Sequence, residues 1–130
     1  MLSENNAIIS HVLSRNGVNV HKFMNNDIRL VEVRDAHVKE LGSNTFDLLT
    51  ADGAVNNDIN PDNTELDTVS LIISEIILAT RLQKQEGCFV LTVIGLQYSI
   101  TCECVALLSD MYNCVQSIKH FTSSACDEAK

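Results

Sequence analysis

An apolar run that ends abruptly in Asp52-Gly53 constrains the fold of this chain more than any other segment. The run covers residues 46–51 and has the length of one buried strand. Apolar rather than alternating strands are typical of parallel sheets whose faces are covered by helices. The carboxyl ends of such strands form the edge where open α/β sheets bind ligands, so Asp52 is predicted to lie there. Taken alone, Asp-Gly after an apolar run also fits an ordinary turn.

Helical and strand-like segments alternate on both sides of this run. Apolar residues at helical spacing, with glycines near the ends, predict helices over residues 3–14, 29–41, 64–85 and 101–113. Strands are predicted over residues 46–51 and 88–94, with further candidates around 18–23 and 115–120. This alternation predicts a single α/β domain over residues 1–130, with right-handed crossovers and a mostly parallel sheet flanked by helices.

The helix predicted over residues 64–85 carries the clearest apolar stripe. Its expected buried residues are Leu66, Val69, Ile73, Ile76, Ile77 and Leu82. Gly87 is its expected C-cap. Glu75 lies inside the apolar stretch, and a charged residue there is expected either to face water or to be paired. In the preceding helix, the expected inward residues are Leu30, Val33, His37 or Val38, and Leu41.

Membrane and secretory classes are disfavoured by the distribution of apolar residues. The longest apolar block, residues 69–82, is interrupted by polar and charged residues, and none approaches the roughly 20 apolar residues that span a bilayer. The first six residues, Met-Leu-Ser-Glu-Asn-Asn, contain no basic residue, so no signal peptide is expected. We therefore expect an intracellular protein in the nucleus, the cytoplasm or both, with no membrane partner.

Charge and cysteine usage limit the possible ligands. The formal net charge of −8 weighs against stand-alone binding to nucleic acid, which depends on Lys and Arg neutralising phosphates. The nine basic residues are scattered, so most of any positive groove for RNA would come from elsewhere. The five cysteines are an odd number and are expected to be reduced thiols. Neither they nor the four histidines show the spacing of a metal site, and no metal is predicted.

Several segments, in order, resemble the second half of the FtsJ-like ribose 2′-O-methyltransferases, in particular the type that modifies the second transcribed nucleotide of capped mRNA (the Adrift type). The matching elements are Thr-Ala-Asp-Gly at residues 50–53, Asn60-Pro61 with Glu65, Gly-x-Phe-Val-Leu at 87–91, and Lys119, Thr122, Ser123, Ala125 and Glu128. The resemblance covers residues 46–130 and extends to 26–28, where Asn-Asp-Ile resembles the family's Gly-Asp-Ile.

The resemblance implies S-adenosylmethionine-dependent methylation of a ribose 2′-hydroxyl in the cap region of mRNA, with capped mRNA as partner. A ribose hydroxyl is a poor nucleophile, so this chemistry needs a positioned base and local positive charge. The family uses two lysines around one aspartate, and Asp52 matches that aspartate. Thr92 occupies the position of the base lysine, and Glu128 matches the glutamate of the C-terminal block. Threonine cannot carry the positive charge or act as a comparable base.

The implied cofactor site is only partly represented. Asp27 and Ile28 match a segment whose aspartate faces the adenine of S-adenosylmethionine in related enzymes, and Asp52 with Gly53 completes the implied contacts. A methyltransferase sheet normally opens with a glycine-rich turn that approaches the methionine end of the cofactor. Residues 1–45 contain two separated glycines and no paired-glycine element. We therefore expect a partial Rossmann-like sheet that lacks the N-terminal, cofactor-loop half.

Three functional hypotheses follow from the sequence. The chain is a minimal, active cap 2′-O-methyltransferase that depends on Asp52, or it is a truncated or degenerate copy that has lost activity because of Thr92 and the missing loop. Alternatively, it is a non-catalytic interaction module derived from the fold, which binds a protein partner through an exposed sheet edge. The inactive copy is the interpretation that the residues favour.

Overall fold

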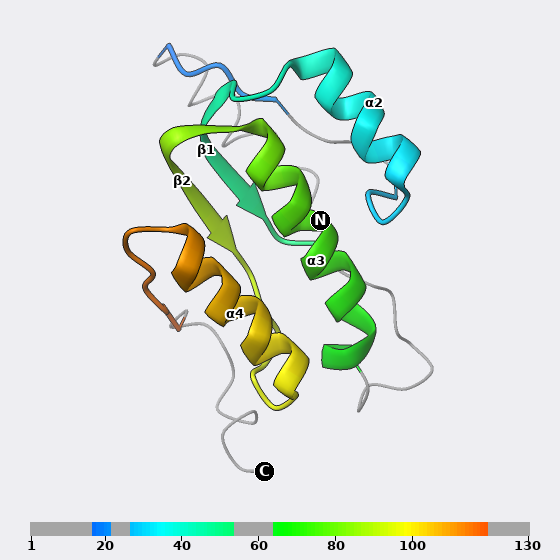
Figure 1. The fold of residues 1–130 in the computed structure, drawn as a ribbon, viewed down its shortest axis with the longest axis vertical. Coiled ribbons are helices and arrows are strands. Elements are labelled where there is room, and N and C mark those ends of the chain that lie inside the picture. The colour runs from blue at the N-terminus through cyan, green and yellow to red at the C-terminus, as the bar shows by residue number, and fades with distance from the viewer. Residues whose placement is uncertain (1–16, 22–26, 54–63, 120–130) are drawn as a thin grey trace.

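A computed structural model describes residues 17–21, 27–53 and 64–119 of the chain (Figure 1). Its elements are α2 (Val31–Leu41), β1 (Phe46–Ala51), α3 (Thr64–Leu82), β2 (Gln83–Leu91) and α4 (Ser99–Met111). β1 and β2 form a two-stranded parallel sheet, and α3 lies between them in the chain as the crossover helix. The predicted α/β class, with a parallel sheet flanked by helices, is therefore confirmed for this part of the chain.

Helix α3 is the centre of the packing. It contacts both strands, and α2 and α4 pack along its two sides (Figure 1). The core joins α3 to α4 through four buried residues, Ile72, Ile76, Cys104 and Leu108. Partly buried side chains from β2 and the segments after β2 and α4 complete it, namely Phe89, Leu91, Val93 and Tyr112. One face of the sheet is thus covered by α3 and α4.

The buried face of α3 matches the predicted stripe in part, since Val69, Ile76 and Leu82 are buried as expected. Leu66, Ile73 and Ile77 are exposed, whereas Ile72 and Leu78 are buried. Several polar residues of α3 are buried too: Glu65, Thr68, Ser74 and Glu75. A single stripe assumes that a helix is covered from one side, but α3 is contacted by four elements. Its buried arc is therefore wide enough to include polar positions.

The start of β2 contains a bulge that the sequence did not predict. The register shifts after the first residue pair, leaving several residues of β2 unpaired with β1. Within this bulge Glu86 has a φ of 66°, in the left-handed region. A Cβ on Gly87 would lie 2.7 Å from Gln83 Cγ, so glycine permits a close approach inside the bulge. The prediction that Gly87 caps α3 is wrong, because the helix already ends at Leu82.

Helix α2 begins and ends near its predicted limits and buries His37, one of its expected inward residues, together with Arg34, which was not expected. Gly42 terminates it with a φ of 83°, and its N–H donates to the Val38 carbonyl. The buried residues of α2 are Arg34 and His37, whereas Leu30 is exposed. Polar groups fill this position because α2 packs on the polar stretch of α3 around Ser74.

The two further strand candidates are not strands where the structure describes them. Residues 18–21 and 115–119 have no regular secondary structure. The helix predicted over 3–14, the Asn60-Pro61 element and the C-terminal block with Glu128 lie outside the described residues. Among the helices that are described, none is long and apolar enough to cross a membrane.

The neighbouring isoleucines Ile72 and Ile73 provide a test of the packing of α3. Ile72 is 2% exposed in the core and Ile73 is 38% exposed. We expect Ile72→Ala to lower the free energy of unfolding by about 2–4 kcal/mol, because it opens a cavity among α3, α4 and β2. Ile73→Ala should cost less than about 1 kcal/mol. Urea denaturation measures both, and equal losses would contradict the described orientation of α3.

Candidate active site at the carboxyl edge of the sheet

The parallel register brings Asp52 and Thr92 together at the carboxyl ends of the two strands. The paired residues along the strands are Leu48 with Cys88, Leu49 with Phe89, Thr50 with Val90, and Ala51 with Leu91. The Thr92 N–H donates to the Ala51 carbonyl at 2.9 Å, which places Thr92 directly opposite Asp52. Residues at matching positions of adjacent strands project from the same face, and both residues are exposed. The two positions that the resemblance assigns to the aspartate and the base are therefore neighbours.

Gly53 fixes this strand end to helix α3. Its N–H donates to Oε1 of Glu75 at 2.9 Å. A Cβ at position 53 would collide with Glu75 Oε1 and with the side chain of Leu71. Only glycine therefore lets the backbone after Asp52 approach α3 this closely.

Glu75 is a buried carboxyl group that lies beside Asp52. The Glu75 residue is only 7% exposed to solvent. Burial raises the pKa of Glu75 above its ordinary value, and the negative charge of Asp52 adds to this, whereas the Gly53 N–H acts in the opposite direction. Glu75 is thus paired, as one of the two sequence-based alternatives proposed, but its partner is the backbone of the candidate site.

Glu65 anchors the segment that follows β2. Its two carboxylate oxygens accept hydrogen bonds from the N–H groups of Gln97 (3.1 Å) and Tyr98 (3.0 Å), immediately before α4. Burial alone would raise the pKa of Glu65, but hydrogen bonds that include those from Tyr98 and Gln97 outweigh it and lower the pKa. A negative charge at this position also suits the amino end of α4. Glu65 therefore holds the chain that leaves the edge after Thr92.

The Asp27–Ile28 segment is tied to the same region of α3. Arg34 Nη1 donates to the carbonyls of Ile28 and Arg29, each at 2.8 Å, and to Ser74 Oγ at 3.3 Å. Ser74 immediately precedes Glu75 in α3, so adjacent residues of one helix tether the segment around Ile28 and the end of β1.

Asp27 itself is engaged by Arg29. Its two carboxylate oxygens accept from the Arg29 backbone N–H, Nε and Nη2 at 2.8–3.0 Å. Hydrogen bonds and charge from Arg29 hold the pKa of Asp27 at about 2, although both side chains are exposed. The aspartate that the resemblance assigns to adenine thus forms a local ion pair.

The structure places the predicted site residues in two groups. Asp52, Gly53 and Thr92 meet at one edge, whereas Asp27 and Ile28 reach that region through Arg34 and α3. The positioning groups Arg34, Glu65 and Glu75 were not predicted as site residues. A usable signal existed for Glu75, because a carboxylate in an isoleucine-rich helix stretch needs a partner.

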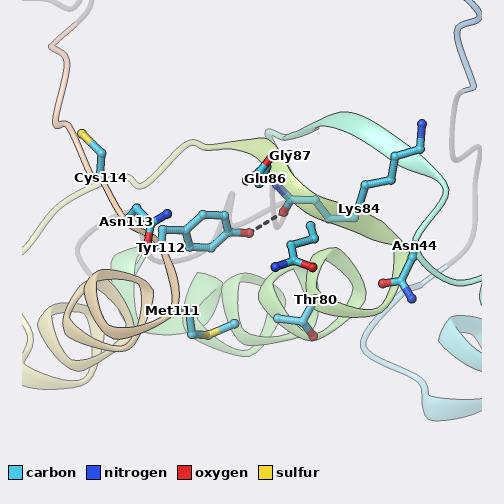
Figure 2. A pocket seen from close by; sticks show the side chains of 11 residues that line it. Asn44, Thr80, Lys84, Glu86, Gly87, Met111, Tyr112, Asn113 and Cys114 are labelled. Atoms are coloured by element: carbon cyan, nitrogen blue, oxygen red, sulfur yellow. Dashed lines mark hydrogen bonds between the residues drawn. The ribbon is translucent and has the colours of Figure 1, made fainter.

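A pocket lies at the opposite end of the sheet, near the amino ends of the two strands (Figure 2). Its lining comes from the β2 bulge, including Lys84 and Gly87, and from the segment after α4, including Tyr112. The Tyr112 hydroxyl donates to Gln83 Oε1 across it. Ligands of open α/β sheets bind at the carboxyl ends of strands, so this pocket does not belong to the candidate site. Within the described part of the chain, no cluster of three or more metal-ligating side chains occurs.

The sequence pattern of the FtsJ-like methyltransferase family matches residues 8–129. The chain belongs to this family. Comparison with curated proteins and with solved structures gave no match. FtsJ-like enzymes are transferases that generally use S-adenosylmethionine, and the βαβ arrangement is consistent with a partial fold of this family.

The described residues of this FtsJ-like chain do not form a cradle for S-adenosylmethionine. A cofactor at this edge needs free backbone N–H groups and an available carboxylate. The Gly53 N–H is already bound to Glu75, and the Asp27 carboxylate is already bound to Arg29. Asp52 presents an exposed carboxylate at the edge.

Acid titration of Glu65 provides a test of the loop anchor. Because its folded-state pKa is lowered, Glu65 stabilises the fold above its ordinary pKa of 4.5, and this stabilisation is lost as the pH falls through the lowered value. We expect Glu65→Gln to reduce the free energy of unfolding by about 1–2 kcal/mol at neutral pH. The difference from the wild type should shrink in acid.

Chemical denaturation at several pH values between neutral and acid measures this difference. Glu40→Gln, on the exposed side of α2, is the matched control and should leave stability almost unchanged. A deficit of Glu65→Gln that stays constant across the pH range would contradict a stabilising Glu65 carboxylate.

Proposed function

We propose that this chain derives from an S-adenosylmethionine-dependent cap methyltransferase, of the type acting on the second transcribed nucleotide of mRNA, and that it does not itself transfer methyl groups. The observation that carries the proposal is the position of Thr92 opposite Asp52. The edge keeps the aspartate of the family and presents a hydroxyl where the base lysine would stand.

The chemistry of this edge supports loss of catalysis. A desolvated lysine can release a proton near neutral pH and then accept one from ribose, and its ammonium form supplies positive charge. The Thr92 side chain does neither. Lys84 is ion-paired with Asp47 near the amino end of β1, and Lys39 lies in the last turn of α2, which leads into that same end. Neither lysine replaces the missing base at the carboxyl edge.

The charge distribution supports weak binding of capped RNA by this chain alone. Arg29, Arg81 and Lys84 each form an ion pair with an aspartate. Arg34 is buried and donates to carbonyl groups and a serine hydroxyl. Together with the net charge of −8, this arrangement offers little positive surface to RNA phosphates. Capped mRNA, in the nucleus or the cytoplasm, is the substrate of the proposed lineage. We expect this chain alone to bind it only weakly.

A methyl-transfer assay tests the proposal. Purified chain is incubated with radiolabelled S-adenosylmethionine and capped RNA, beside a catalytically active FtsJ-like enzyme. We expect no transfer by the wild type, and none by Thr92→Lys, because the cofactor contacts are also incomplete. Wild-type transfer that disappears in Asp52→Ala would instead establish an active enzyme, and robust turnover by Thr92→Lys would contradict the incomplete cofactor site.

A second candidate function, a non-catalytic interaction module, is favoured by the uncovered side of the sheet. Leu48 is 55% exposed and Val90 is 51% exposed, on the face opposite α3 and α4. Within the described residues each strand has one hydrogen-bonded neighbour, so each also presents an edge to which another chain could add.

Sedimentation analysis tests this second candidate. If the uncovered face is an interface, the chain should form a defined oligomer that Val90→Lys dissociates, because a charge there opposes burial. Leu107→Lys, at an exposed position of α4, is the matched control and should leave the oligomer intact. A monomer at all concentrations, with no stable partner complex, would count against the interaction module.

A further inference from the structure

Helix α3 holds two buried glutamates, and each binds a segment that follows a strand. Glu65 accepts from Gln97 and Tyr98, beyond the end of β2, and Glu75 accepts from Gly53, at the end of β1. Glu75 is the one next to the candidate site, since its partner directly follows Asp52. A buried carboxyl group is costly without such a hydrogen bond, so the position of Glu75 and that of Gly53 depend on each other.

We propose that Glu75 is a positioning residue for Asp52. Through its hydrogen bond to Gly53 it fixes the peptide after Asp52 and directs the Asp52 side chain toward position 92. The inference deepens the proposed function, because it takes Asp52 as the aspartate of the site. It concerns the geometry of the edge and does not depend on turnover.

Two hydrogen bonds and one steric restriction around Gly53 support the proposal. The Gly53 N–H lies 2.9 Å from Glu75 Oε1. A Cβ at position 53 would collide with the side chains of Glu75 and Leu71, so the backbone lies close against this part of α3. One residue earlier, the Ala51 carbonyl is held by the Thr92 N–H at 2.9 Å. Asp52 thus lies between two fixed peptide groups, one bound to Thr92, directly after β2, and the other bound to Glu75.

Amide hydrogen exchange tests whether Glu75 holds this strand end. In Glu75→Leu the Gly53 N–H loses its acceptor, and its exchange should accelerate about tenfold. Glu75→Gln keeps a carbonyl oxygen of the same reach and should retain the wild-type protection. Glu65→Leu, a matched change in the same helix, should expose the Gln97 and Tyr98 amides and leave Gly53 protected. Equal Gly53 protection in the wild type and Glu75→Leu would overturn the proposal.

A second measurement asks whether Asp52 still faces position 92. In the Thr92→Lys chain, the pKa of the introduced ammonium is followed by NMR with and without Asp52→Asn. The carboxylate should raise that pKa when Glu75 is present, and the upward shift should persist with Glu75→Gln. With Glu75→Leu the shift should be lost. A shift that is unchanged in Glu75→Leu would also overturn the proposal.

These measurements separate the inference from the proposed function. Neither uses S-adenosylmethionine, RNA or methyl transfer, so an active wild-type chain would refute the proposed loss of catalysis and leave the role of Glu75 open to the same test. Conversely, unprotected Gly53 in the wild type would refute the positioning role whatever the transfer assay gives.

Discussion

The buried polar groups of α3 hold the candidate site together. Glu65, Ser74 and Glu75 are taken out of water when α3 packs among β1, β2, α2 and α4. Polar groups in such places are tolerated when they are hydrogen-bonded, and their partners here belong to segments of the site or its surroundings. The same contacts satisfy the helix and shape the carboxyl edge, so the helix cannot be repacked without altering the site.

Arg34 extends this dependence to the segment around Ile28, which the resemblance assigns to cofactor binding. Its guanidinium reaches two carbonyls around Ile28 and the hydroxyl of Ser74. Arginine suits this task because its donors are rigidly arranged and it remains charged. The segment around Ile28 and the strand end at Gly53 are far apart in sequence, yet both are attached to consecutive residues of α3.

Local patterns in the sequence predicted α2, β1, α3, β2 and α4, whereas only the family resemblance associated Asp52 with Thr92. The apolar run over residues 46–51 is β1 itself, and parallel neighbours necessarily align their carboxyl ends. The pattern of α3 predicted a helix and part of its inward set: Val69, Ile76 and Leu82 are buried, but the other predicted residues are exposed, because periodicity cannot reveal that several elements will surround the helix. The prediction for Gly87 is wrong because glycine occurs both at helix ends and at close contacts, and only the β2 bulge shows which applies here. The Glu75–Gly53 bond joins residues 22 positions apart and depends on packing, beyond the reach of local patterns.

Position 92 contributes to the sheet through its backbone alone. The Thr92 N–H bonds to Ala51, whereas its side chain is exposed. Nearly any residue can therefore occupy this position at little structural cost, in contrast to position 53, where a side chain would displace Glu75 and Leu71. Under the proposed function, a lineage in which selection for catalysis is relaxed could exchange its base at this position by neutral drift, while selection for folding maintains the scaffold.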